Sequence, residues 1–315
     1  MMASAIEEAP VNSPLPRRRF MSGALGAAAM LAVGPALPGE VSAQGRVSRT
    51  GGTRVRLGLN AYSFTEPLRA GTMTLDDLVD YCAQQGFDGL DATGYYFPGY
   101  PKVPDDAFLF GLKRRAFLNG VTISGTGVRN DFAVADAEAR RRDVEMVKRW
   151  IEAAAKLGAT VVRIFAGLAV PKGGSFEGTL GWMVPDIKAC VDHGRQHGVI
   201  VGLQNHNDFL KTAEETIRVV EAVNSEWFGV ILDVGSLRQG DPYAEIEKLV
   251  PYAVTWQLKE KVWYGSREVT TDIGRINAIV DKLGYRGFLP IETLGSGDPR
   301  VKVSTFLAEI RRHFV

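Results

Sequence analysis

Short apolar runs alternate with stretches of helical hydrophobic spacing between residues 55 and 315 of this chain. A strict alternation of this kind is typical of buried parallel strands joined by covering helices. The eight strand-like runs are 56–64, 87–95, 121–128, 160–167, 199–206, 228–235, 255–262 and 287–294. The eight helical stretches are 74–86, 105–119, 136–157, 180–197, 212–224, 241–250, 272–283 and 298–313. Several of these helices stop at a glycine just before the next run, which is the usual punctuation of repeated strand–helix units.

Eight strand–helix units favour a closed barrel over an open sheet. An open doubly wound sheet shares the alternation, but no Gly-x-Gly-x-x-Gly motif follows the first run. The count of eight and the length of about 260 residues match a barrel of eight parallel strands. We therefore predict an α/β fold of the (β/α)8 TIM barrel class, formed by a single domain over residues 55–315.

The first 43 residues have the layout of an export signal. Arg17, Arg18 and Arg19 precede Phe20, a Gly- and Ala-rich apolar stretch and a small-residue cleavage site at 41–43. This order predicts a secretory signal, and the twin arginine predicts the Tat type. A basic tail without a signal function is the alternative.

The same segment is not expected to anchor the protein in a membrane. Its apolar stretch is short and weakly hydrophobic for a spanning helix, and no lipoprotein cysteine follows it. Residues 44–54 are polar and Gly-rich, which predicts a linker. We expect a periplasmic or secreted protein with no stable membrane anchor.

Charge and cysteine content exclude several classes of protein. The formal net charge is +1, so there is no basic excess to neutralise phosphates, and a nucleic-acid partner is not expected. Hydrophobic residues make up 45% of the chain, as in a globular protein with one large core. Cys82 and Cys190 both fall in helical stretches and give no support for a zinc site or a disulfide. The oligomeric state stays open, a homo-oligomer included.

Four of the later apolar runs end in a polar oxygen donor. They are Gln204, Asp233, Gln257 and Glu292, separated by 29, 24 and 35 residues. In a TIM barrel the active site lies at the carboxyl ends of the strands, and neighbouring strands are about 4.8 Å apart. Four inward side chains at one height would converge on a single point, which suits a divalent cation and a polyol ligand.

Each of the four also has a plainer interpretation. Asp233 could cap the helix after its strand, Glu292 could pair with a buried base, and the two glutamines could be hydrogen-bonded linings with no ion. Two carboxylates buried in one mouth without a cation or base would be costly, however. The set is therefore stronger evidence for a site than any single member.

Further polar residues fall on the same strand ends. Lys259 shares the face of Gln257 and could hold a carbonyl or enolate oxygen, or could be an ordinary surface lysine. His206 follows Gln204 by two residues and could bind substrate or move a proton. Arg163 interrupts an apolar run and should face the barrel interior, where it needs a partner; Asp91 on the second strand is the expected one.

His193 and His197 are spaced i, i+4 on one predicted helix. Such a pair can bind metal. This helix carries no glutamate between them and lies on the outer ring, so we do not assign them a metal from sequence.

The strand-end motifs resemble those of the sugar phosphate isomerase/epimerase family, the xylose isomerase-like TIM barrels, over about residues 55–315. That family holds a divalent metal with Glu, Asp, His and Glu on strands 5 to 8, in runs of the form E-N-H, D-x-G-H, H-x-K-D and a final E. The corresponding runs here are QNH at 204–206, DVGS at 233–236, QLKE at 257–260 and Glu292.

The resemblance implies a metal held by Gln204, Asp233, Gln257 and Glu292. It also places Glu292, Lys259 and His206 in catalysis, and Arg163, Asn205, Asp91 and Ser236 at the substrate. An all-oxygen ligand set favours Mn²⁺ or Mg²⁺ over Zn²⁺.

The departures from the family pattern reduce the set of reactions that the predicted site could catalyse. Family epimerases use the glutamates of strands 5 and 8 as two bases on opposite faces of the sugar, and Gln204 cannot act as a base. We therefore expect an exported enzyme that moves a proton next to a sugar carbonyl with Glu292 as its base. A 3-keto-glycoside lyase or hydratase is one alternative, and a non-catalytic sugar-binding barrel is another.

Overall fold

The computed structural model describes residues 45–314, and within them eight parallel strands form a closed barrel. The strand order around the barrel is β1-β10-β7-β6-β5-β4-β3-β2, and β1 pairs in parallel with both β10 and β2. The strands are β1 Arg54–Asn60, β2 Gly89–Thr93, β3 Thr122–Gly127, β4 Val161–Phe165, β5 Ile200–Gln204, β6 Phe228–Asp233, β7 Ala253–Lys259 and β10 Arg286–Glu292. The predicted (β/α)8 barrel is confirmed.

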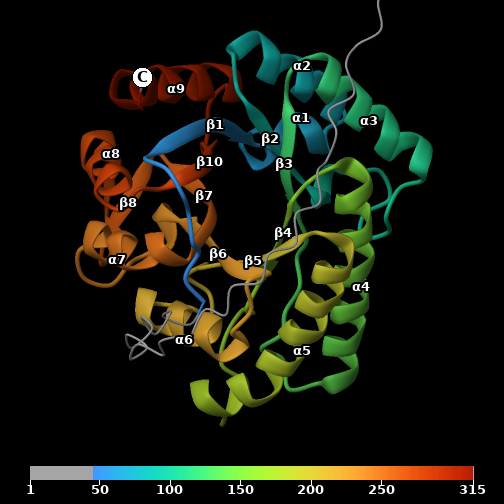
Figure 1. Ribbon diagram of the computed structural model, residues 1–315, viewed down its shortest axis with the longest axis vertical. Helices are drawn as coiled ribbons and strands as arrows, with labels where there is room; N and C mark the ends of the chain where they lie inside the picture. The colour runs from blue at the N-terminus through green and yellow to red at the C-terminus, as the bar shows by residue number, and fades with distance from the viewer. Residues whose placement is uncertain (1–44, 315) are drawn as a thin grey trace, which may run out of the picture. The chain divides into compact units, whose positions relative to one another are not determined.

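Long helices follow the strands and cover the outside of the barrel (Figure 1). They are α2 Leu75–Gln85, α3 Asp106–Leu118, α4 Ala137–Leu157, α5 Phe176–His197, α6 Ala213–Val223, α7 Pro242–Leu249, α8 Ile273–Lys282 and α9 Pro299–Phe314. Apolar side chains such as Val162, Leu203 and Val230 are fully buried in the core that the strands and helices share. None of these helices is long and apolar enough to cross a bilayer.

The helix boundaries follow local capping chemistry. The Asp136 carboxylate accepts a hydrogen bond from the Glu138 N–H at 2.9 Å and so begins α4. Gly158 ends that helix at a φ of 78°, a left-handed conformation that glycine adopts without strain. Ser175 caps α5 in the same way as Asp136 caps α4, which starts α5 at Phe176, ahead of the predicted residue 180.

Two elements were not expected from the sequence. A short helix, α1 Thr65–Arg69, follows β1, and a hairpin of β8 Lys261–Tyr264 and β9 Arg267–Thr270 follows β7. The predicted run 255–262 joined the end of β7 to the start of β8, because both segments are apolar and the break between them at Glu260 carries no turn residue. The predicted signal peptide at 1–43 lies outside the described residues, and so does the first residue of the 44–54 linker.

Candidate active site at the barrel mouth

The carboxyl ends of the strands surround a cavity of about 160 Å³. Polar side chains from six strands line it, among them Asn60, Thr93, Arg163, Gln204, Gln257 and Glu292. A second cavity of about 480 Å³ shares four of its lining residues with the first, namely His206, Lys259, Glu292 and Leu294. Two adjoining cavities with polar and charged side chains at this end of a barrel suit a small polar ligand.

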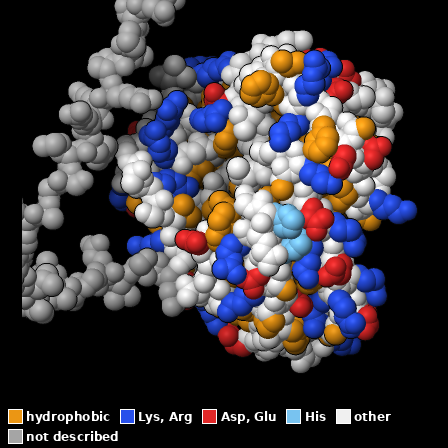
Figure 2. Space-filling view, turned by 45° about the vertical axis from the view of Figure 1, so that its right-hand side comes forward, with side chains coloured by type: hydrophobic (Ala, Val, Ile, Leu, Met, Phe, Trp, Pro, Cys, Tyr) orange, Lys and Arg blue, Asp and Glu red, His pale blue; other side chains and the backbone are white. Residues whose placement is uncertain are grey.

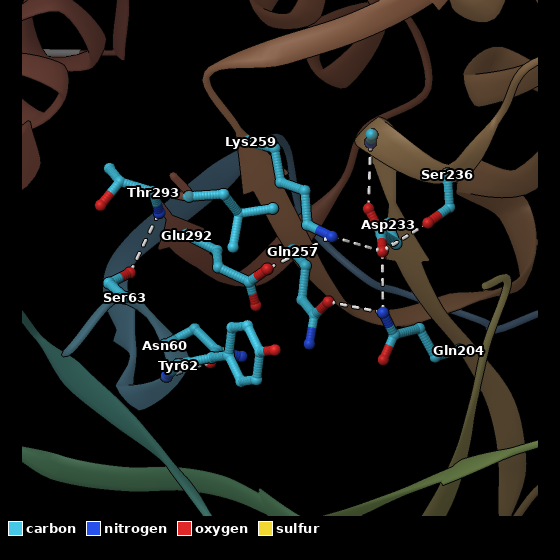
Figure 3. Close-up of polar contacts among 12 residues, drawn as sticks. Asn60, Tyr62, Ser63, Gln204, Asp233, Ser236, Gln257, Lys259, Glu292 and Thr293 are labelled. Carbon is cyan, nitrogen blue, oxygen red and sulfur yellow. Dashed lines mark hydrogen bonds and ion pairs between the residues drawn. The ribbon is translucent and has the colours of Figure 1, made fainter. Parts of the chain in front are cut away.

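The four strand-end residues predicted to meet do converge. Gln204, Asp233 and Glu292 are the last residues of β5, β6 and β10, and all are buried. Gln257 lies two residues before the end of β7, level with Asp233 across the sheet. Gln204 Nε2 lies 2.7 Å from both Asp233 Oδ2 and Gln257 Oε1 (Figure 3). Three of the four therefore form one hydrogen-bonded cluster.

The direction of the Gln204 amide is set by Arg163 on β4. Arg163 Nη1 donates to Gln204 Oε1 at 3.2 Å. A guanidinium group can only donate, so the amide oxygen must face it and the NH₂ must face Asp233 and Gln257. Gln204 thus offers hydrogen atoms, not a lone pair, to the centre of the cluster.

Lys259, the last residue of β7, fills the space between the two carboxylates. Its Nζ lies 2.7 Å from Asp233 Oδ2 and 3.2 Å from Glu292 Oε1, as Figure 3 shows. Burial alone lowers the pKa of Lys259, but the charges of Asp233 and Glu292 outweigh burial and hold that pKa above its usual value. The ammonium is therefore a permanent cation at the mouth.

The two carboxylates that contact Lys259 have pKa values shifted in opposite directions. Burial opposes ionisation of Asp233, but Lys259 and hydrogen bonds from its neighbours keep the pKa of Asp233 below its ordinary value. Burial raises the pKa of Glu292, with the negative charge of Asp233 adding to the rise and Lys259 opposing it. The pKa of Asp233 is thus held below its ordinary value and that of Glu292 above it, although both carboxylates contact the same ammonium.

Arg163 does not form the expected ion pair with Asp91. Its Nη2 donates to the Tyr95 hydroxyl at 2.7 Å, and its guanidinium carbon lies 4.3 Å from the Phe165 ring centroid. Asp91 instead accepts from Asn60 Nδ2 at 3.1 Å. Burial raises the pKa of Asp91 to about 6 against the opposing charge of Arg163. Asp91 is not among the residues that line the two cavities, whereas its partner Asn60 is, and a substrate role for Asp91 stays a prediction.

Asn205 and Ser236 both form hydrogen bonds with Asp233. Asn205 Oδ1 accepts from the Asp233 N–H at 2.7 Å, and Asn205 Nδ2 donates to the Asp233 carbonyl at 3.0 Å. Asn205 is buried and is not among the residues that line the two cavities, and its role at the substrate stays a prediction. Ser236 Oγ donates to Asp233 Oδ2 at 2.8 Å and also lines the larger cavity. His206 lines both cavities, with Nδ1 2.8 Å from Asp208 Oδ2.

Sequence comparison agrees with the fold. The profile of the xylose isomerase-like TIM barrel family matches residues 79–310, well over half of the chain. The chain belongs to this family. No curated protein sequence matches it.

Solved structures of xylose isomerase-like barrels share the fold at low sequence identity. D-psicose 3-epimerase from Clostridium cellulolyticum H10 is 17% identical with a TM-score of 0.68, over 82% of this chain and 99% of that one. The 3-keto-D-glucoside 4-epimerase YcjR from E. coli is 15% identical with a TM-score of 0.66, over 82% and 100%. The IOLI protein, solved with a bound zinc atom, is 15% identical with a TM-score of 0.66, over 82% and 99%. Two of these are sugar epimerases, in line with the prediction of an enzyme.

The donors of this member of the family, as they are arranged, do not fit a divalent cation. Mg²⁺ and Mn²⁺ need converging oxygen atoms. Here the Lys259 ammonium lies between Asp233 and Glu292, and Gln204 turns its NH₂ inward. Asp233 Oδ2 accepts from Gln204, Ser236 and Lys259, and Asp233 Oδ1 accepts from the Gly235 N–H. Metal ligation by the four predicted residues stays a prediction, and the chemistry below uses the chain's own groups.

Several lining residues were missed from sequence. Asn60 ends β1 just as Gln204 ends β5, so the same polar-end signal could have found it. Arg129 follows β3 in a loop and carries no such signal. Trp263 comes from the unpredicted hairpin, and its ring lies 4.2 Å from the Arg238 guanidinium carbon at the rim of the larger cavity.

Proposed function

We propose that this barrel moves a proton next to the carbonyl group of a small carbohydrate, with Glu292 as the base. The observation that carries the proposal is the pairing of Glu292 with Lys259 at the cavity wall. A carboxylate whose pKa is raised by burial is a stronger base than an exposed one and is suited to accept and return a proton. An ammonium beside it is suited to the negative charge that develops on the substrate oxygen.

Lys259 supplies the charge stabilisation in this scheme. An ammonium group has three hydrogens, and two of them are directed at Asp233 and Glu292. Within residues 45–314 the third has no acceptor, so it can donate to a carbonyl or enolate oxygen in the cavity that Lys259 lines. Asp233 holds the ammonium in place, and Ser236, Gln204 and the Gly235 N–H hold Asp233.

A single base favours chemistry on one face of the sugar. Gln204 has no titrating group. β5 and β10 therefore do not carry the two catalytic bases that epimerisation, with one base on each face of the sugar, requires. One-face proton transfer serves aldose–ketose isomerisation. It also serves elimination or hydration next to a ketone, and the neighbour that acts on a 3-keto-D-glucoside favours this 3-keto-glycoside version.

A metal-dependent version of the site has one observation in its favour, the zinc atom in the IOLI neighbour. It would place Mn²⁺ or Mg²⁺ among Gln204, Asp233, Gln257 and Glu292. Lys259 would have to leave Asp233, and Gln204 would have to turn its oxygen inward. A non-catalytic sugar-binding barrel is the other alternative, motivated by the loss of one family glutamate and the strand-end histidines.

Turnover of unphosphorylated ketoses and 3-keto-glycosides, followed by NMR, tests the proposal. We propose export on the basis of residues 1–43, and an exported enzyme would meet unphosphorylated sugars. New sugar signals that require the protein support the enzyme. Saturable sugar binding without new signals would instead establish the binding barrel.

The pH dependence of kcat/KM is expected to report Glu292. The base must be ionised, so activity should rise with pH through the pKa of Glu292, which burial places above the ordinary glutamate value. The pKa of Asp233 is lowered, so its ionisation should not add a second pH-dependent change in kcat/KM near neutral pH. A pH–rate profile from pH 4 to 9 measures this, and activity that is flat down to pH 4 would contradict the assignment of Glu292 as the base.

A further inference from the structure

The outer helix layer brings two histidines and a glutamate together, far from the mouth. His193 and His197 lie one turn apart on α5, and Glu152 reaches them from the neighbouring helix α4. Their ligand atoms, one nitrogen from each ring and a carboxylate oxygen, all lie within 4.8 Å of one another. Glu152 supplies the acidic partner that the histidine pair lacks within its own helix.

The contacts within this cluster show that the three groups already face each other. Glu152 Oε1 lies 3.0 Å from His193 Nε2. The two imidazole rings have centroids 4.5 Å apart. Within residues 45–314, Glu152 makes no ion pair with a lysine or arginine, so its charge is not already matched by a fixed cation. Figure 2 shows histidine side chains beside acidic ones on the surface that α4 and α5 form.

We propose that Glu152, His193 and His197 bind a divalent transition-metal ion such as Zn²⁺. Imidazole nitrogens with one carboxylate are ligands that zinc accepts, and an i, i+4 histidine pair presents both rings on one helix face. A tetrahedral ion with bonds of about 2.0–2.2 Å keeps its ligand atoms roughly 3.4 Å apart, so small rotamer changes complete the site. The fourth position faces solvent, because Glu152 and His197 are exposed.

The site would act as a clip between the two longest helices of the barrel. Its ligands come from α4 and α5, so an ion bound there favours the folded arrangement of both over the unfolded chain. It does not depend on the proposed function at the mouth, since none of its three residues lines either mouth cavity. It also means that metal found in the whole protein cannot be assigned to the mouth without a variant.

Isothermal titration calorimetry, in which zinc chloride is added to the chelator-treated full chain, tests the proposal. We expect one site of micromolar or tighter affinity. His197→Ala and Glu152→Gln should each weaken it by at least about 10-fold, since loss of a group that merely supports a ligand already costs about 10- to 100-fold. Both changes are on exposed side chains, and near-native circular dichroism would verify folding.

Two further variants decide where the ion binds. His313→Ala removes another surface histidine, and Asp233→Asn removes the mouth carboxylate; neither should alter zinc affinity. Absence of zinc binding to the wild-type chain would overturn the proposal. So would unchanged affinity in both helix variants, which would mean that the three side chains form only a hydrogen-bonded surface cluster.

Discussion

Replacing Glu292 with glutamine is expected to lower kcat for a keto-sugar by about 10²- to 10⁴-fold, the usual contribution of a positioned base. The change keeps the side-chain shape and its contact with the cavity but removes the proton acceptor. The dissociation constant for the sugar should therefore stay within a few-fold of wild type. Stopped assays for turnover and calorimetry for binding separate the two quantities.

A matched control makes this result specific. Glu226 is exposed and lies two residues before the start of β6, at the end of the barrel opposite the mouth. Glu226→Gln changes the same atoms and should leave kcat and binding unchanged. If Glu292→Gln retained full activity, the base would have to be another group.

Replacing Lys259 with methionine should abolish activity and also destabilise the fold by about 3–5 kcal/mol, the cost of leaving buried charges without their partner. Methionine fills much of the volume of the lysine stem, but Asp233 and Glu292 then lose the ammonium that lies between them. Urea unfolding at pH 8 measures the loss.

The pH dependence of that loss identifies its cause. Lys259 holds the pKa of Glu292 down against burial, so its loss raises that pKa further. Lowering the pH then protonates this carboxyl and removes one of the two unpaired charges. The stability deficit of Lys259→Met should therefore shrink between pH 8 and pH 5. Lys188→Met, at an exposed position on α5, is the control and should cost little at either pH. A Lys259→Met protein as stable as wild type at pH 8 would contradict the role of the ammonium as the cation of the mouth.

The sequence was sufficient to predict the barrel and the place of its site. Helix ends such as Gly158 are marked by residues that are adjacent in the sequence, so a single sequence is enough to predict them. Gln204, Asp233 and Glu292 interrupt apolar runs at strand ends, so closure of the barrel brings them together as predicted. The hairpin β8–β9 was missed because no turn residue separates it from β7.

The arrangement of the donors could not be predicted in the same way. The amide of Gln204 is oriented by Arg163, which comes from a different strand. Lys259 lies level with Glu292 across the β7–β10 pair, and only that register places its ammonium between two carboxylates. Asn205 occupies a position of the family motif. Its side chain forms two hydrogen bonds with the backbone of Asp233 and so links the end of β5 to β6. Such contacts depend on side chains that are distant in sequence.

The helix cluster illustrates the same point on the outer surface. The spacing of His193 and His197 is visible in the sequence, but Glu152 lies 41 residues before His193 and on another helix. Only the packing of α4 on α5 brings it into range. The histidine spacing alone therefore supplied two candidate ligands, and the fold adds the third.

Solvent deuterium exchange into a ketose tests the central claim most directly. Wild-type protein, treated with a chelator and kept in D₂O, is incubated with the sugar that it turns over, and the carbon-bound proton signal is followed by NMR. We predict that the exchange persists after chelation, is unchanged in Glu152→Gln and is lost in Glu292→Gln. Exchange that disappears on chelation and returns with added Mn²⁺, in both wild type and Glu152→Gln, would contradict the proposal. It would mean that a metal ion, and not Lys259, supplies the positive charge on which the reaction depends.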